Sequence, residues 1–121
     1  MNPYVVEVRR QLHTYPKIGF DLNRTLAFLK GELDKIGVEY TEKYGKSSLV
    51  ATVNPEKSHF TIGIRADIDA LPITELNDVP YKSKIEGQMH ACGHDARNDW
   101  RGLLLFCKNK ARMLLSTWSF Q

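Results

Sequence analysis

The architecture of this chain is set by Phe60-Thr61-Ile62-Gly63-Ile64-Arg65-Ala66-Asp67-Ile68-Asp69. Its first half is a short apolar run that is typical of a buried strand. This strand delivers the segment 65–69 at its carboxyl end, and in open α/β sheets that edge is where binding sites form. The sequence therefore predicts an α/β fold with a polar site at the end of this strand.

A first helix is predicted near the N-terminus. Val5, Val8 and Leu12 fall at helical spacing. The pattern ends before Pro16, because proline disfavours helix in the residue that precedes it.

A second helix is predicted from Asn23 onward. Asn23 is available as the N-cap, and Gly37 as the left-handed residue that stops the helix. Its apolar residues recur at three- and four-residue intervals: Leu26, Leu29, Leu33 and Ile36. Two strands, Val38 to Lys43 and Leu49 to Val53, then form a predicted adjacent pair, joined through a turn that contains Gly45.

The amino-acid composition of the chain limits the classes of function that we expect for it. The 121 residues are 42% hydrophobic and 26% charged, which is ordinary for one soluble domain. The formal charge of +3 is spread along the chain, so it gives no case for nucleic acid. No apolar run approaches a membrane span or a secretory signal, and two cysteines without export signals favour free thiols over a disulfide. We therefore expect a cytoplasmic protein without membrane or nucleic-acid partners.

A candidate metal site lies in His90-Ala91-Cys92-Gly93-His94-Asp95. Cys92 and His94 can point into one cavity because alternate side chains of an extended segment share a face. Thiolate and imidazole together suit zinc or another borderline transition ion. Such a site usually needs about three or four protein ligands, so the remaining ones must come from elsewhere. His90 could be a further ligand, but a role in orienting a ligand or in hydrogen-bonded structure is favoured.

Asp67 and Asp69 are separated by one residue at the end of the predicted strand, so both can face the metal-binding segment. A carboxylate that accepts a hydrogen bond from a ligating histidine fixes its tautomer and raises its basicity. The alternative is that both aspartates cap the following loop or pair with Arg65. His13 is predicted to satisfy backbone carbonyl groups at a helix end, and His59 to be a solvated surface residue.

Three segments in this order resemble one family: 9–16 (RRQLHTYP), 65–73 (RADIDALPI) and 89–95 (MHACGHD). They are similar to the metal-dependent amidohydrolases that include bacterial aminoacylases, hippurate hydrolase, N-acetyldiaminopimelate deacetylase and plant auxin-conjugate hydrolases. The resemblance covers roughly residues 7 to 96.

The resemblance implies part of a zinc-peptidase-like catalytic domain, with two N-terminal helices followed by strands of a mixed sheet. It implies two divalent ions, zinc or manganese, and hydrolysis of the amide bond of small N-acyl amino acids. Cys92 would bind or bridge the metals, His94 would be a direct ligand, and Asp69 would orient a ligand. Asp67 belongs to the same motif, and His90 is assigned beside the ligands.

Residues 1–96 are expected to be the N-terminal part of the catalytic domain. The family's glutamate base, its other ligands and its dimerisation domain are absent here, so no catalytic residue is assigned and an inactive fragment is expected, with a homodimer only when that domain is present. Residues 97–121 diverge: they are either a frameshifted tail or a segment with a helix over 103–115. The alternative function is a small metal-binding or redox module that uses Cys92 and His94.

Overall fold

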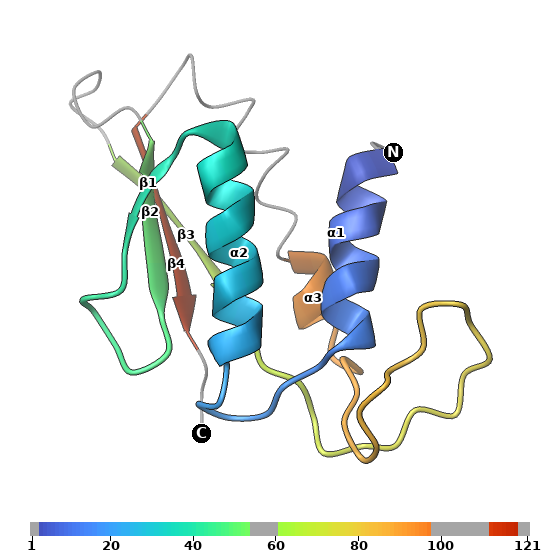
Figure 1. Ribbon diagram of the computed structural model, residues 1–121. Coiled ribbons are helices and arrows are strands. Elements are labelled where there is room, and N and C mark those ends of the chain that lie inside the picture. Colours follow the sequence, from blue (N-terminus) through green and yellow to red (C-terminus); the bar gives the residue numbers. More distant parts are fainter. Residues whose placement is uncertain (1–2, 54–60, 98–111, 119–121) are drawn as a thin grey trace.

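The computed structural model describes residues 3–53, 61–97 and 112–118, as helices beside a small sheet (Figure 1). The predicted α/β class is confirmed, with two N-terminal helices ahead of the sheet. In chain order the elements are α1 (Pro3–Thr14), α2 (Asn23–Ile36), β1 (Glu39–Thr41), β2 (Leu49–Val53), β3 (Thr61–Asp67), α3 (His94–Arg97) and β4 (Arg112–Trp118).

The sheet is mixed, as predicted, and its strand order is β1-β2-β4-β3. β1 and β2 are antiparallel neighbours, which confirms the predicted strand pair, although β1 is shorter than predicted. β2 and β4 are antiparallel, whereas β3 and β4 are parallel. The last strand in the chain therefore lies between two earlier ones, where it is drawn in red in Figure 1.

β4 corrects the helix that was predicted over residues 103–115. Residues 112–115 belong to this strand, and residues 103–111 lie outside the described part of the chain. The physical reason is that a strand between two neighbours can satisfy its backbone N–H and C=O groups on both sides. The predicted surface histidine His59 also lies outside the described residues.

α2 starts without a side-chain cap, so the prediction that Asn23 is the N-cap is wrong. Leu22 occupies the cap position, and Asn23 is the first helical residue. Leu22 is completely buried. Burying a leucine is worth about 1.5–3 kcal/mol, whereas a polar cap contributes about 1 kcal/mol, so the apolar contact sets the start of this helix.

The end of α2 is as predicted. Gly37 has φ 65° and ψ 42°, in the left-handed region. Its N–H donates to the carbonyl of Asp34 at 3.1 Å, and the N–H of Val38 donates to the carbonyl of Leu33 at 3.2 Å. These two bonds are the Schellman arrangement, which satisfies the last carbonyl groups of a helix and turns the chain toward β1.

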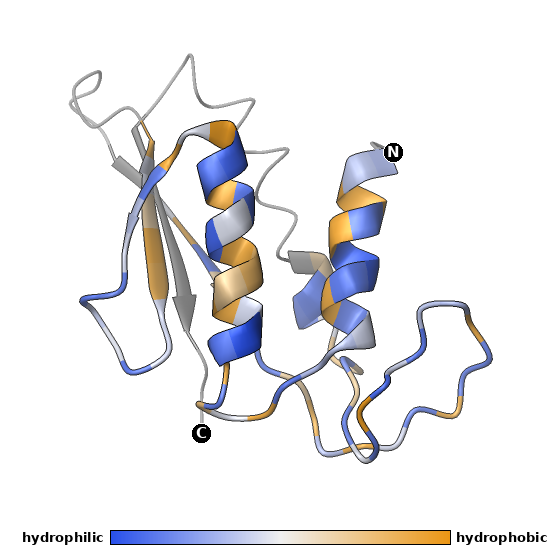
Figure 2. Ribbon diagram, in the orientation of Figure 1, coloured by the Kyte–Doolittle hydropathy of each residue, from blue (hydrophilic) through white to orange (hydrophobic). Residues whose placement is uncertain are grey.

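The core lies between the sheet and α2, and α1 lies next to α2 (Figures 1 and 2) and adds Leu12 to the buried cluster. β2 is almost entirely buried. Figure 2 shows the apolar residues of α2 and β2 in orange, and hydrophilic residues in blue along both α1 and α2. The buried cluster comprises Leu12, Leu22, Leu26, Leu29, Leu33, Val38, Leu49, Ala51, Val53 and Ile68.

Candidate metal centre

Two sequence motifs are joined directly after β3. Ile68 is completely buried and anchors the chain between two aspartates that remain partly accessible. Further on, Leu71 and Met89 form an isolated antiparallel bridge, with N···O distances of 3.0 and 3.1 Å. This bridge brings the segment 65–71 beside the segment 89–95, which confirms that the two motifs meet.

His94 lies between both aspartates of the β3 motif. Its Nδ1 is 3.1 Å from Oδ1 of Asp69 and 3.1 Å from the Asp69 backbone carbonyl oxygen. Its Nε2 is 3.9 Å from Oδ2 of Asp67. The Nδ1 contacts require that this nitrogen donates a proton, which is the tautomer that a carboxylate imposes on a ligating histidine.

The contacts of Asp67 agree with both predictions made for it from the sequence. It faces His94, and its Oδ1 also accepts a hydrogen bond from Arg65 at 2.8 Å. The predicted pairing with Arg65 is therefore present together with the predicted orientation toward the metal-binding segment. The Arg65 guanidinium, which is itself about half exposed, compensates the charge that Asp67 brings to this edge of the sheet.

Cys92 is a free, exposed thiol two residues before His94 in the chain. Gly93, which follows it, has φ 78°, a backbone conformation that a residue with a Cβ rarely adopts. Within residues 3–53, 61–97 and 112–118, no three His, Cys, Asp or Glu side chains are grouped closely enough to hold an ion. The thiol, imidazole and carboxylate groups of this region are of the kinds that bind a divalent cation. The described residues alone do not form a complete site for one.

His90 is buried, with 4% of its surface exposed, and it lies beside this site. Among the described residues, its Nδ1 has no hydrogen-bond partner. Burial lowers the pKa of His90 to about 4, against the attraction of the Asp95 carboxylate. The imidazole is therefore neutral at pH 7, and its role as a ligand or an orienting group stays a prediction.

A second histidine site is formed at Asp95 of α3, and the sequence did not predict it. His13 is buried, with its Nδ1 2.7 Å from Oδ2 of Asp95 and its Nε2 3.0 Å from Oε1 of Glu75. The prediction that His13 satisfies backbone carbonyls at a helix end is therefore wrong. Two buried carboxylates attract this imidazole more strongly than the neutral carbonyl groups of α1 could.

Arginine side chains complete this cluster. Arg9 lies one turn before His13 on α1, and its Nε is 2.8 Å from Oδ2 of Asp95. The guanidinium groups of Arg9 and Arg10 stand 5.1 and 4.9 Å from the centre of the Tyr81 ring, which also meets His13 edge-on. The i, i+4 spacing of Arg9 and His13 was the one signal in the sequence that they share a helix face.

Glu75 is held by the loop that follows β3. Burial would raise the pKa of Glu75, but hydrogen bonds from the backbone N–H of Ser83, from His13 and from Asn77 outweigh it and lower that pKa below its ordinary value. The Ser83 N–H lies 2.7 Å from Glu75 Oε2, and the Asn77 amide lies 3.3 Å from Oε1. Glu75 is therefore a buried carboxylate that keeps its negative charge.

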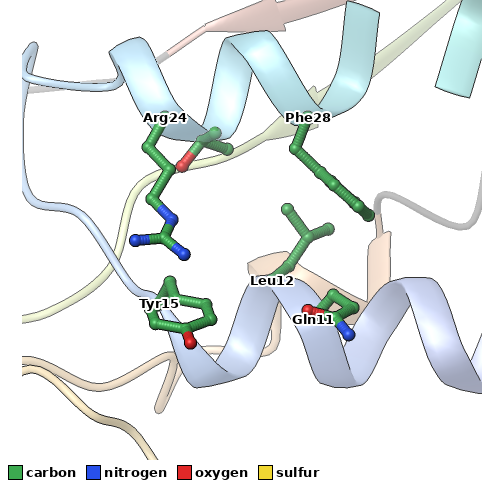
Figure 3. A pocket seen from close by; sticks show the side chains of 6 residues that line it. Gln11, Leu12, Tyr15, Arg24 and Phe28 are labelled. Carbon is green, nitrogen blue, oxygen red and sulfur yellow. The ribbon is translucent and has the colours of Figure 1, made fainter. Parts of the chain in front are cut away.

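The pocket between α1 and α2 is separate from this chemistry (Figure 3). It has a volume of about 70 Å³, and Arg24 stacks over the Tyr15 ring at 3.6 Å across its mouth. Its other lining residues are Gln11, Leu12, Thr25 and Phe28. None of the residues predicted for the metal site lines it, so we interpret it as a packing gap between the two helices.

The α/β fold and a histidine held by an aspartate at the end of a strand are typical of metal-dependent hydrolases, and the comparisons with known proteins agree. Residues 63–99 match peptidase family M20/M25/M40, and the chain belongs to this family. The match begins within the strand β3 and includes every residue predicted for the metal site.

The sequence of this chain is also similar to those of curated proteins, over most of its length. The chain is 42% identical to hippurate hydrolase of Campylobacter jejuni over 102 residues, which are 84% of this chain and 26% of that protein. It is 40% identical to N-acetyldiaminopimelate deacetylase of Halalkalibacterium halodurans over 96 residues, which are 78% of this chain and 26% of that protein.

A solved structure shares the fold. The YXEP protein of Bacillus subtilis, described as a dinuclear metal binding peptidase of the M20 family, superposes with a TM-score of 0.86 at 30% identity. The superposition covers 94% of this chain and 34% of that one. The chain thus spans about a quarter of the length of the curated relatives that it matches. In the described part of the chain, no helix has the length and apolar character that crossing a membrane requires.

Proposed function

We propose that this chain supplies part of the metal centre of an enzyme that hydrolyses the amide bond of N-acyl amino acids. The observation that supports this most directly is the contact between His94 Nδ1 and Asp69 at 3.1 Å. A carboxylate in this position orients an imidazole for metal binding and fixes its tautomer. A histidine with a merely structural role does not require a second, accessible carboxylate beside it, which Asp67 provides.

The proposed residue roles are those that the resemblance to the family implies, and the chemistry of the side chains fits them. His94 binds a divalent cation, zinc or manganese, through its imidazole, and Cys92 binds or bridges the cations through its thiolate. Asp69 holds His94, while Asp67 and His90 line the same region. A bound cation supplies Lewis acidity to an amide carbonyl and lowers the pKa of water to about 7. No general base is assigned among the residues of this chain.

The substrate class rests on the relatives. Hippurate and N-acetyldiaminopimelate are both N-acylated amino acids, and the proteins named for acting on them are about 40% identical to this chain. We therefore infer a small N-acyl amino acid as the substrate of the complete active site. Turnover needs donors beyond those described here, so the chain alone is expected to bind metal without hydrolysing such substrates.

Further proposals concern the domains, the cellular location and the oligomeric state of the protein. We propose that residues 1–96 are one part of the catalytic domain, that residues 97–121 have diverged from the family, and that the protein acts in the cytoplasm without nucleic-acid or membrane partners. Dimer formation is proposed only for a protein that has the family's second domain.

The test is cation binding by the purified chain, measured by calorimetry with Zn²⁺, Mn²⁺ and Co²⁺, with hippurate hydrolysis assayed in parallel. His94→Ala and Cys92→Ser should each abolish or strongly weaken binding. Asp21→Asn is the matched control, because its side chain is 73% exposed and should leave binding unchanged. Binding that is identical in all four proteins would contradict the proposal.

The same experiment separates the hydrolase reading from the alternative of a small metal-binding or redox module. That alternative predicts one ion per chain and no hydrolysis under any condition. Hydrolysis by a longer protein that contains this segment, lost in the His94→Ala variant, would support the enzyme.

A further inference from the structure

We propose that Leu71 and Met89 form an apolar surface beside the candidate metal centre, and that this surface receives the uncharged acyl group of an N-acyl amino acid. The identity of the ligand rests on the proposed function, whereas the place of the two side chains beside Asp69 does not.

The chain keeps the alternation of a strand beyond the end of β3. Ile68 and Ala70 are buried. The residues that alternate with them are accessible: Asp67 and Asp69 in part, and Leu71 with 36% of its surface exposed. Successive side chains of an extended segment point to opposite faces, so the two carboxylates and the leucine lie in one row.

Backbone hydrogen bonds on both sides of this segment support its extended conformation. The N–H of Ala70 donates to the carbonyl of Lys17 at 2.7 Å, whereas the N–H of Leu71 donates to the carbonyl of Met89 at 3.0 Å. Neighbouring residues of a strand bond to opposite sides in this way. Leu71 is therefore on the same face as Asp69, at roughly 6–7 Å along the chain from it.

Met89 lies directly across from Leu71. Its N–H donates to the carbonyl of Leu71 at 3.1 Å, so the two residues exchange both backbone bonds. Directly opposed residues of antiparallel segments present their side chains on the same face. Met89 is half-buried, and its flexible thioether adapts to ligands of different shape. The two side chains thus form one apolar surface.

This surface adjoins the candidate metal centre from two directions. Leu71 comes two residues after Asp69, which holds His94 at 3.1 Å, and Met89 comes three residues before Cys92. A single exposed leucine is ordinary on a protein surface. A pair of large apolar side chains beside a few convergent polar groups is instead the composition of a small-molecule site.

The chemistry of N-acyl amino acids decides which half of the ligand lies on this surface. The amino-acid half carries a carboxylate, which is strongly hydrated and loses free energy when it is moved onto apolar groups. The acyl half is uncharged, and in hippurate it ends in an aromatic ring. An acyl group with more apolar area therefore gains more from contact with Leu71 and Met89.

The experiment is ¹³C NMR of the methionine methyl groups of the full chain, titrated with hippurate and with N-acetylglycine, both with and without Zn²⁺. These two probes share the glycine carboxylate and the amide bond and differ only in the acyl group. The Met89 signal is identified by its loss in Met89→Leu. Hippurate should shift it at concentrations about 5-fold or more below those that N-acetylglycine requires. Equal concentration dependence of the two probes would overturn the proposal, as would a Met89 signal that hippurate leaves unchanged in both conditions.

Leu71→Ser and Leu76→Ser form a matched pair of variants. Both remove an accessible leucine from the same loop, and Leu76 is 89% exposed. Leu71→Ser should weaken hippurate binding about 5-fold or more and leave the affinity for N-acetylglycine nearly unchanged, while Leu76→Ser should alter neither. An equal loss of hippurate affinity in the two variants would overturn the proposal.

Leu71→Met tests the same position with a side chain that keeps the apolar area. It should retain the parent affinity for hippurate, and it serves as the test if Leu71→Ser does not fold. Loss of hippurate binding in this conservative variant would count against an apolar contact at this position.

Zn²⁺ binding separates this proposal from the proposed function. If the chain binds Zn²⁺ but hippurate leaves the Met89 signal unchanged, the metal centre stands and the apolar surface fails. If the chain binds no Zn²⁺ and hippurate still shifts Met89 in a way that depends on Leu71, the metal function fails and the surface stands.

Discussion

Nδ1 of His13 lies 2.7 Å from Oδ2 of Asp95, across 82 residues of sequence. The contact joins the end of α1 to the short helix α3, and it is made by two side chains that are both buried. Because Asp95 directly follows His94, the candidate metal ligand and the ionic cluster are neighbours in the chain but face different partners. The stability of this contact and the geometry of the site should therefore change together.

The strength of the buried contact between His13 and Glu75 can be measured with a double-mutant cycle of His13→Gln and Glu75→Gln. Removing one partner of a buried hydrogen bond leaves the other group unsatisfied, which typically costs about 1–3 kcal/mol, so each single variant should be clearly less stable in urea unfolding. The double variant should be less destabilised than the sum, with a coupling of about 1–3 kcal/mol. Strict additivity would mean that the two side chains do not interact.

His90 should make the folded state sensitive to mild acid. Its pKa falls from 6.5 to about 4 on folding because it is buried, so the unfolded chain binds more protons between these values. Its stabilising contribution is complete above pH 6.5 and is lost as the pH falls to about 4, by roughly 3 kcal/mol in all. His90→Gln cannot titrate, so its stability should fall less than that of the parent chain across this window. Parallel pH profiles of the two proteins would contradict the assignment.

Asp69 should control metal affinity without being a ligand. Asp69→Ala removes the carboxylate that holds Nδ1 of His94, although the backbone carbonyl at the same position remains. The loss of an orienting carboxylate typically weakens metal binding about 10–100-fold, measurable by competition with a chromophoric chelator. The exposed-surface variant Asp21→Asn should retain the parent affinity, and equal affinities for all three proteins would remove Asp69 from the site.

Replacing the glycine within α2 and the glycine that ends it by alanine should change stability in opposite directions. Gly37 has a positive φ, and Gly31 is helical, yet an added Cβ meets no atom within 4 Å at either position. Gly37→Ala should destabilise by about 1–2 kcal/mol, because the left-handed conformation is unfavourable for alanine. Gly31→Ala should stabilise by about 0.5–1 kcal/mol through helix propensity. Melting temperatures that move in the same direction would argue against the described end of α2.

Local patterns in the sequence predicted the parts of the structure that depend on local physics. The spacing of leucines predicted α2, and Gly37 predicted its end, because both depend on a few consecutive residues. The start of α2 was predicted less well, since the buried side chain of Leu22 overrides the cap preference of Asn23. Tertiary burial decided that position.

The part of the site that was predicted is the meeting of the two motifs that carry the candidate metal-site residues. The residue pair Asp69 and His94 was expected to meet, and it does. The partnership of His13, Glu75 and Asp95 was not expected, because the three residues come from separate segments and their spacing gives no hint of contact. Only the folded arrangement of α1, the long loop and α3 shows that a second histidine is shared between carboxylates.

The place of β4 between β2 and β3 determines when this sheet can form during synthesis. β2 and β3 are both made before β4, yet in the described sheet each pairs with that later strand and not with the other. Until Trp118 has left the ribosome, the nascent chain presents an incomplete sheet whose apolar strand β2 lacks one neighbour. The sheet therefore cannot close before all four described strands have been made, and in the interval before closure the open edge of β2 is accessible to a chaperone that binds exposed strands.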